Sequence, residues 1–186
     1  MSTSTTIQLT NHQQLEHSIL NLIKGIRDHP ERANAVFKAK STLRDGFVAK
    51  VNIRDFSFLS DEPQDLGGTD LGPSPVEYVL GAFAACQEIV IKAYATVLGI
   101  EVTTVKVQVE GNLDLHGFLN LSDERPGFTG VSYTTVIETD ETDPDKLKQL
   151  EYFSVNRCPV LDIIQNPVPV NGTLEFVPTG QLESQR

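Results

Sequence analysis

Tryptophan is absent from the 186-residue sequence, and cysteine is rare, with only Cys86 and Cys158. Two cysteines cannot form the set of disulfides that stabilises small secreted domains, so each is either a packed core residue or a reactive group. Histidine is also scarce, and the histidines lack the short spacings that are typical of metal ligands. The sequence therefore predicts no metal site. The histidines are His12, His17, His29 and His116.

Positive charge is scarce as well, because 15 basic residues face 25 acidic ones and give a formal net charge of −10. Binding to nucleic acid or to an anionic membrane surface needs clustered lysine and arginine, and this sequence has no basic cluster. We therefore expect neither as a partner. The first residues lack the basic flank and apolar core of a secretion signal, so we expect a cytoplasmic protein with reduced thiols.

The length suits one domain with a sizeable core. Apolar residues at helical spacing between Leu15 and Ile26 predict an amphipathic helix that ends near Pro30. We expect residues 1–35 to form an N-terminal helical extension and residues 36–178 to form the domain. Residues 179–186 are expected to be a flexible tail.

A loop rich in glycine and proline leads directly into an apolar segment that carries Cys86. Ser74 and Glu77 have the Ser-x-x-Glu spacing of a capping box, and Pro75 suits the first helical position. Gly99 is a suitable left-handed end. The sequence therefore predicts a helix over residues 75–98. Its second half is too polar for a membrane span, so we expect a buried central helix.

Alternating apolar residues predict several strands. Two of them lie between residues 36 and 58 and form a hairpin, because Asp45-Gly46 at the break is a strong turn signal. Further strands are predicted over 102–109, 131–137 and 168–176. Short helices are predicted to begin at Pro144 and Pro159. This order of elements predicts an α+β fold with antiparallel sheets.

The order of these elements resembles the OsmC/Ohr family of thiol-dependent peroxidases over about residues 36–176. The resemblance is carried by Gly-Gly-x-Asp-x-Gly-Pro-x-Pro at 67–75, Ala-Ala-Cys at 84–86 and Cys-Pro at 158–159. It implies an intertwined homodimer in which antiparallel sheets of both subunits wrap long central helices. It also implies reduction of organic hydroperoxides by two cysteines without a cofactor. A dithiol, in some members a lipoylated protein, then re-reduces the pair.

Matched residue by residue, the resemblance assigns Cys86 as the thiol that attacks the peroxide and Cys158 as the resolving thiol. Arg44 matches the arginine that stabilises the thiolate. Members of the Ohr type carry a glutamate directly after the second proline of the loop, where it holds that arginine. This sequence has Val76 at that position, which leaves the tether of the arginine open.

Glu77, one residue later, is a candidate replacement for the tether. At 100° per residue it lies about 180° around the helix from Cys86, whereas position 76 lies about 80° away. Helix capping already explains a glutamate at this position. Three carboxylates in the preceding loop are alternatives that spacing does not separate: Asp61, Glu62 and Asp70.

Cys86 is expected about 16 Å into its helix, beyond the first turn where the helix dipole acts. Burial raises the pKa of a thiol, so its reactivity needs a positive charge from elsewhere. The resemblance supplies Arg44, and Arg54 and Arg157 are alternatives. Cys158 stands just before a helix start, where free N–H groups favour a thiolate.

Two other functions stay open. The same cysteine pair would serve another thiol oxidoreductase or a redox sensor. Alternatively, the chain is a non-catalytic dimeric scaffold or a protein that binds small apolar ligands, and its cysteines only pack.

Overall fold

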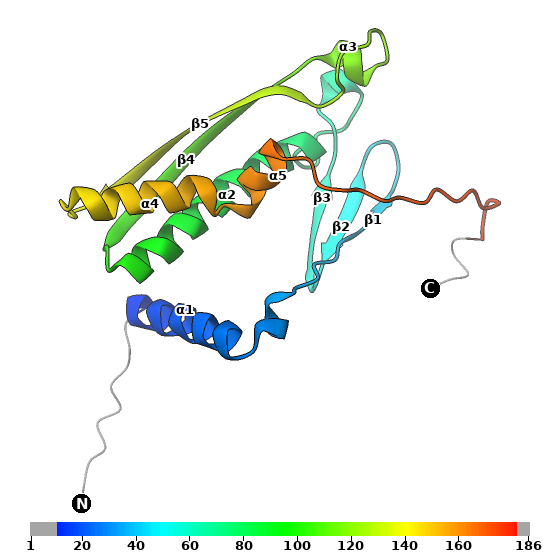
Figure 1. Cartoon of the computed structure of the whole chain (residues 1–186). Coiled ribbons are helices and arrows are strands. Elements are labelled where there is room, and N and C mark those ends of the chain that lie inside the picture. Colours follow the sequence, from blue (N-terminus) through cyan, green and yellow to red (C-terminus); the bar gives the residue numbers. More distant parts are fainter. Residues whose placement is uncertain (1–10, 182–186) are drawn as a thin grey trace, which may run out of the picture.

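A computed structural model describes residues 11–181 (Figure 1). Most of the tail predicted over 179–186, and the start of the N-terminal extension, lie outside the described residues. The expected first helix is present as α1 (Asn11–Asp28), followed by the 3-10 turn η1 (Pro30–Ala33). The half-buried side chains of α1 repeat at helical spacing, at Leu15, Ile19, Ile23 and Ile26.

The first sheet is an antiparallel meander of three short strands: β1 (Lys40–Leu43), β2 (Ala49–Ile53) and β3 (Phe56–Ser60). The predicted turn at Asp45-Gly46 is confirmed, with Gly46 at φ 61°. The prediction of only two strands is wrong, because the chain turns again at Arg54 and Asp55, where Arg54 has φ 53°. Two non-glycine residues form that second turn, so the Asp-Gly signal is missing there.

The second sheet is a long two-stranded ribbon formed by β4 (Val102–Leu113) and β5 (Phe128–Thr139). Val105 pairs with Ile137 and Val109 with Tyr133 across this ribbon. The short helix α3 (Leu115–Phe118) lies at its far end (Figure 1). Both predicted strands are confirmed and are longer than expected.

The central helix α2 (Pro75–Leu98) follows the 3-10 turn η2 (Gln64–Leu66), and its predicted bounds are confirmed. Ser74 and Glu77 form the capping box, and Gly99 ends the helix in the left-handed conformation at φ 66°. The helix packs against the β4–β5 ribbon, α4 (Pro144–Asn156) and α5 (Pro159–Gln165) (Figure 1). It therefore lies at the centre of the core.

Of the described helices, α2 alone has the length and apolar composition that crossing a membrane requires. Core helices of soluble proteins pass the same test, so this is weak evidence of a membrane span. Here the buried residues of α2 pack in two core clusters with residues of β4, α4 and α5. The cluster toward its C-terminal end consists of Ile91, Ala95, Ile100, Val102 and Leu150.

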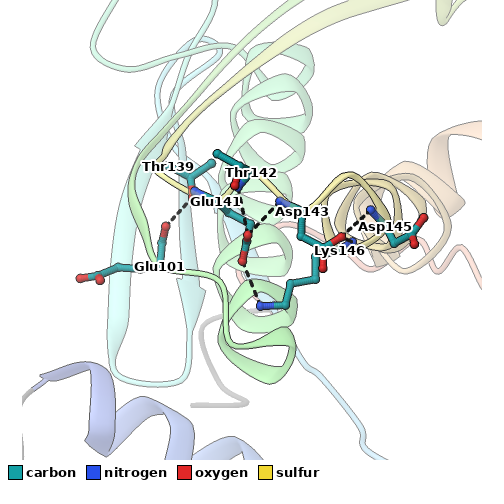
Figure 2. Close-up of polar contacts among 7 residues, drawn as sticks. All are labelled: Glu101, Thr139, Glu141, Thr142, Asp143, Asp145 and Lys146. Atoms are coloured by element: carbon teal, nitrogen blue, oxygen red, sulfur yellow. Dashed lines mark hydrogen bonds and ion pairs between the residues drawn. The ribbon is translucent and has the colours of Figure 1, made fainter.

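A group of polar contacts fixes the start of α4 against the ribbon (Figure 2). The Glu141 carboxylate accepts hydrogen bonds from the N–H groups of the next two residues and from Lys146 Nζ, the last at 2.9 Å. Thr139 Oγ1 donates to the Glu101 carbonyl at 2.6 Å and accepts from the Glu141 N–H at 3.1 Å. The end of β5, the start of β4 and the first turn of α4 are thereby joined, which sets the direction in which α4 leads to Cys158.

The strand predicted over residues 168–176 does not form in the single chain. This segment leaves α5 as extended chain without strand pairing (Figure 1). A strand needs a hydrogen-bonded neighbour, and the described part of this chain supplies none here. The alternating apolar side chains that predicted a strand are instead 52% to 90% exposed: Val168, Val170, Leu174 and Phe176.

Candidate active site

The fold brings the two cysteines together. Cys86 lies in the middle of α2, and Cys158 is the residue that immediately precedes α5. Their thiols are within hydrogen-bonding reach of each other, and both are free. Cys158 is 1% exposed and Cys86 is partly buried. Two residues far apart in the sequence therefore form one pair of neighbouring thiols.

The walls around this pair are apolar. Phe83, Val90 and Leu161 form a buried cluster with Cys158, and Cys86 packs against it. The Phe83 ring meets the Tyr133 ring edge to face, with 4.9 Å between ring centroids. The surroundings therefore favour neutral, apolar groups beside the sulfur atoms.

The pKa of the Cys86 thiol is raised, and burial is the largest cause. A hydrogen bond from the backbone N–H of Val160 opposes this by favouring the thiolate, whereas the neighbouring Cys158 raises the pKa further. The predicted effect of burial is confirmed. The sequence predicts that N–H groups at the start of α5 favour the Cys158 thiolate. In the structure the Val160 N–H donates to Cys86 instead, and Cys158 makes no side-chain capping bond to α5.

Arg44 lies on the exposed turn between β1 and β2, where its backbone N–H donates to the Val48 carbonyl at 2.7 Å. No arginine of the described chain is among the causes of the Cys86 pKa shift. Arg54 stacks over the Phe56 ring, and Arg157 donates to the Asn156 carbonyl. One chain alone therefore does not bring any of the candidate cations to the thiol, and the role of Arg44 stays a prediction.

Glu77 is exposed, and its carboxylate accepts a hydrogen bond from the Ser74 N–H at 2.7 Å. This is the capping contact that the sequence predicts. It occupies the carboxylate at the start of α2, away from the middle of the helix where Cys86 lies. A role for Glu77 in the active site stays a prediction that no contact of the described chain supports.

Asp61 organises the loop that leads into α2. Its side chain is 1% exposed and accepts hydrogen bonds from the Glu62, Thr69 and Leu71 N–H groups and from the Thr69 hydroxyl, at 2.6 to 3.2 Å. These bonds, the Thr69 hydroxyl first, hold the pKa of Asp61 below its ordinary value. The carboxylate is thus already committed to the loop, so Asp61 is a poor candidate for the tether of an arginine.

Gln87 is a residue of this region that sequence reasoning missed. It is 1% exposed, and its side-chain amide donates to the Ser154 carbonyl of α4 at 3.0 Å. Its signal in the sequence is its position four residues after Phe83 and four before Ile91, in the middle of an apolar stripe. A polar residue at such a place needs a buried partner.

The described part of the chain contains no group of histidine, cysteine and acidic residues that could hold a metal ion. The chemistry that the neighbouring cysteines support is thiol chemistry. Two adjacent thiols can close to a disulfide, and the Val160 N–H can stabilise negative charge on the Cys86 sulfur.

Comparisons with solved structures show what the fold is similar to. An OsmC-like protein from Mycoplasma pneumoniae is similar with a TM-score of 0.61 at 18% identity, over 72% of this chain and 90% of that one. An organic hydroperoxide resistance protein OsmC from Legionella pneumophila reaches 0.53 at 22% identity, over 71% of this chain and 90% of that one. One from Elizabethkingia anophelis reaches 0.52 at 16% identity, over 72% and 91%. At these identities the likeness establishes the fold.

Comparison by sequence gives two results. No curated protein matches the chain. The sequence model of the OsmC-like protein family matches residues 67–172, which is more than half of the chain and includes both cysteines. With its antiparallel sheets and long central helix, this chain belongs to the OsmC-like family.

Proposed function

We propose that this protein is a thiol-dependent peroxidase that reduces organic hydroperoxides through Cys86 and Cys158. The observation that carries the proposal is the pair of neighbouring thiols in an apolar cluster, with a backbone N–H donor directed at the Cys86 sulfur. Two of the structural neighbours are named organic hydroperoxide resistance proteins, which supports the choice of substrate class.

The proposed reaction has three balanced steps. The Cys86 thiolate attacks the distal oxygen of the hydroperoxide, which breaks the O–O bond and gives a sulfenic acid and, after protonation, an alcohol. The Cys158 thiol then displaces the sulfenic oxygen as water, and the disulfide forms. An external dithiol, for which a lipoylated protein is our candidate, reduces the disulfide and is itself oxidised to a disulfide.

The apolar walls supply the preference for organic substrates. The alkyl group of an organic hydroperoxide loses contact with water when it lies against residues such as Phe83 and Leu161, which is favourable. Hydrogen peroxide has no such group. We therefore propose that kcat/KM is higher for an apolar hydroperoxide than for hydrogen peroxide.

A second copy of the chain is part of the proposal. α2 leaves Ile89 69% exposed, and Phe47 and Phe56 of the first sheet region are 53% and 64% exposed. Exposed apolar surface of this extent is typical of surfaces that pack against another chain. We propose a homodimer in which a second copy covers these residues and brings its Arg44 to the Cys86 thiolate. The expected location is the cytoplasm, where dithiols keep the pair reduced.

The test is steady-state consumption of cumene hydroperoxide with dihydrolipoamide as the reductant. We expect turnover by the native chain, none by Cys86→Ser, and sulfenic acid without an intramolecular disulfide in Cys158→Ser. Arg44→Ala should lose most activity, whereas Arg44→Lys should keep more of it. Arg125→Ala is a matched control, because Arg125 lies in the loop between α3 and β5 and should not affect activity. Absence of turnover together with unmodified thiols overturns the proposal.

A redox sensor is the second candidate, favoured by one observation. The pKa of Cys86 is raised, and no arginine acts on it within the described chain. A sensor would form the disulfide once per peroxide and would be re-reduced slowly. Oxidation by one equivalent of cumene hydroperoxide, without turnover in the presence of dihydrolipoamide, would identify the sensor.

A further inference from the structure

Gln87 follows Cys86 directly and is a buried amide that lies along α2 between Phe83 and Val90, two residues of the cluster that contains Cys158. A buried amide costs free energy unless it makes hydrogen bonds. The partner here is the Ser154 carbonyl, which accepts from Gln87 Nε2 at 3.0 Å. This hydrogen bond is therefore the physical reason for a polar side chain at this point of the core.

Ser154 lies in the last turn of α4, just before the chain bends toward Cys158. The Arg157 N–H still bonds back to the Phe153 carbonyl at 2.9 Å. Cys158 then has extended backbone, with φ −86° and ψ 111°. Carbonyl groups in the last turn of a helix lack intrahelical donors, and Gln87 supplies a donor to one of them. The residue beside Cys86 thus caps the helix end that leads to Cys158.

A second contact holds the same turn of α4. The Phe153 ring stacks on the Tyr94 ring at 4.2 Å between centroids and 13° between planes. Tyr94 lies two helical turns after Gln87 and so on the same face of α2. The ring stack resists separation of α4 from α2, and the directional hydrogen bond of Gln87 fixes the position of the helix end along α2.

We propose that Gln87 is a positioning residue for the cysteine pair: its hydrogen bond to Ser154 holds the bend between α4 and α5 so that Cys158 stays against Cys86. The equilibrium constant for disulfide formation then depends on Gln87, although its amide donates to the Ser154 carbonyl and not to either sulfur. The inference rests on the proposed peroxidase function only for the biological role of the disulfide. The positioning of Cys158 by Gln87 can be tested without peroxide.

The test measures the thiol–disulfide equilibrium of the full chain with glutathione, without peroxide. In this equilibrium the protein disulfide and two glutathione thiols give two protein thiols and one glutathione disulfide. Both the oxidised and the reduced protein are used as starting points, and the acid-quenched mixtures are analysed by mass spectrometry. Gln87→Met keeps the size of the side chain and removes the donor. Gln87→Glu replaces the amide by a titratable group of the same shape.

We expect Gln87→Met to lower the equilibrium constant for disulfide formation by about tenfold at neutral pH. Without the hydrogen bond the bend is mobile in the reduced chain, and closing the disulfide must then order it at the conformational cost of about one residue. Gln87→Glu should lose at least as much, because its carboxylate faces a carbonyl oxygen. As the pH falls from about 8 to 5 the carboxyl becomes protonated and can donate to the Ser154 carbonyl, so its constant should return toward that of the native chain. This recovery is not expected from a residue that only fills space.

Ile100→Val is the matched control, because it weakens the other core cluster without touching the bend. Its equilibrium constant should equal that of the native chain. The inference is overturned if both Gln87 variants stay within about twofold of the native chain at every pH, or if Ile100→Val falls as far as Gln87→Met. If Gln87→Met does not fold, the pH profile of Gln87→Glu decides alone. If the Gln87 variants show the expected change in the equilibrium constant but the native chain does not turn over peroxide, the peroxidase proposal is wrong and this inference still holds.

Discussion

The backbone N–H of Val160, in the first turn of α5, donates a hydrogen bond to the sulfur of Cys86 in the middle of α2. The donor follows Cys158 in the sequence by two residues, so the segment that supplies the second thiol also supplies a group that favours the thiolate of the first. The two cysteines are thus linked by electrostatics as well as by proximity.

Because Cys158 and the Val160 N–H act on the Cys86 thiol in opposite directions, removing each of them should shift its pKa in opposite directions. Burial raises its pKa, so its alkylation by iodoacetamide should reach half of its maximal rate above the ordinary thiol value of 9.0. Cys158→Ala removes a neighbour that raises the pKa, so the midpoint should move to lower pH. Val160→Pro removes the N–H donor at a position where helices accept proline, so the midpoint should move higher.

Alkylation rates between about pH 7 and 11, with mass spectrometry to assign the modified cysteine, measure both shifts. Equal midpoints in all three proteins would show that neither neighbour acts on the thiol.

Asp61 predicts how stability responds to acid. Its pKa is lowered in the folded chain, so the carboxylate stabilises the fold at pH values above its ordinary value of 3.8, and this contribution is lost as the pH falls through the folded pKa. Asp61→Asn should unfold at a temperature several degrees lower at neutral pH, since an amide cannot accept from all four donors. Below about pH 4 the difference from the native chain should shrink.

Thermal unfolding followed by circular dichroism at a series of pH values is the measurement. Asp65→Asn is the control, because Asp65 lies in the adjacent η2 turn and its side chain is exposed. This control should unfold close to the native temperature throughout the series. A gap between Asp61→Asn and the native chain that is independent of pH would contradict the prediction.

Substituting alanine for two glycines, one in the loop before α2 and one within α2, should change the free energy of unfolding in opposite directions. A Cβ atom at Gly68 would overlap the Glu62 carbonyl, and backbone cannot yield as a flexible side chain does. Gly68→Ala should therefore lower the free energy of unfolding by more than about 1 kcal/mol. A Cβ atom at Gly81, within α2, would meet no atom within 4 Å beyond the neighbouring backbone of its own helix. Gly81→Ala should therefore raise stability by about 0.5–1 kcal/mol.

Urea unfolding of both variants measures these differences. Destabilisation by Gly81→Ala would mean that a second chain packs closely against this part of α2.

The exposed C-terminal segment predicts how the proposed dimer responds to charge. Leu174 and Phe176 are 80% and 90% exposed in the single chain. If a second copy buries them, Phe176→Asp should weaken the dimer by at least about tenfold, because burial of one such side chain contributes roughly 1.5–3 kcal/mol. Thr173→Asp, at a position of the opposite parity in this alternating segment, should have a smaller effect. Sedimentation velocity over a range of concentrations separates these outcomes.

Much of the fold follows from local signals. Ser74, Glu77 and Gly99 set the bounds of α2, because capping and left-handed ends depend on residues next to one another in the sequence. The turn at Gly46 is predictable for the same reason. The turn at Arg54 is not, since its residues carry no turn preference of comparable strength, and the segment 168–176 has strand alternation but no strand partner in its own chain.

The site is predictable only in part. Cys86 and Cys158 follow from the family resemblance, but the hydrogen bond from Val160 depends on how α5 packs on α2, which no spacing reveals. Sequence spacing does not distinguish Asp61 from Glu62 and Asp70 as a tether for the arginine. Only the hydrogen bonds that Asp61 accepts in the structure show that it holds the loop. Gln87 is visible as a polar residue in an apolar stripe, but its partner Ser154 lies on a distant helix.

The meander of β1, β2 and β3 has a consequence for the dynamics of the chain. Its large apolar residues, among them Leu43 and Phe56, include side chains that are more than 60% exposed, so little buried surface supports these strands in the single chain. Three short strands with so little burial open at a small free-energy cost, whereas α2 opens only with the core. Amide hydrogens of the meander should therefore exchange with solvent long before those of α2, and their protection should rise steeply if the second copy of the proposed homodimer covers the sheet.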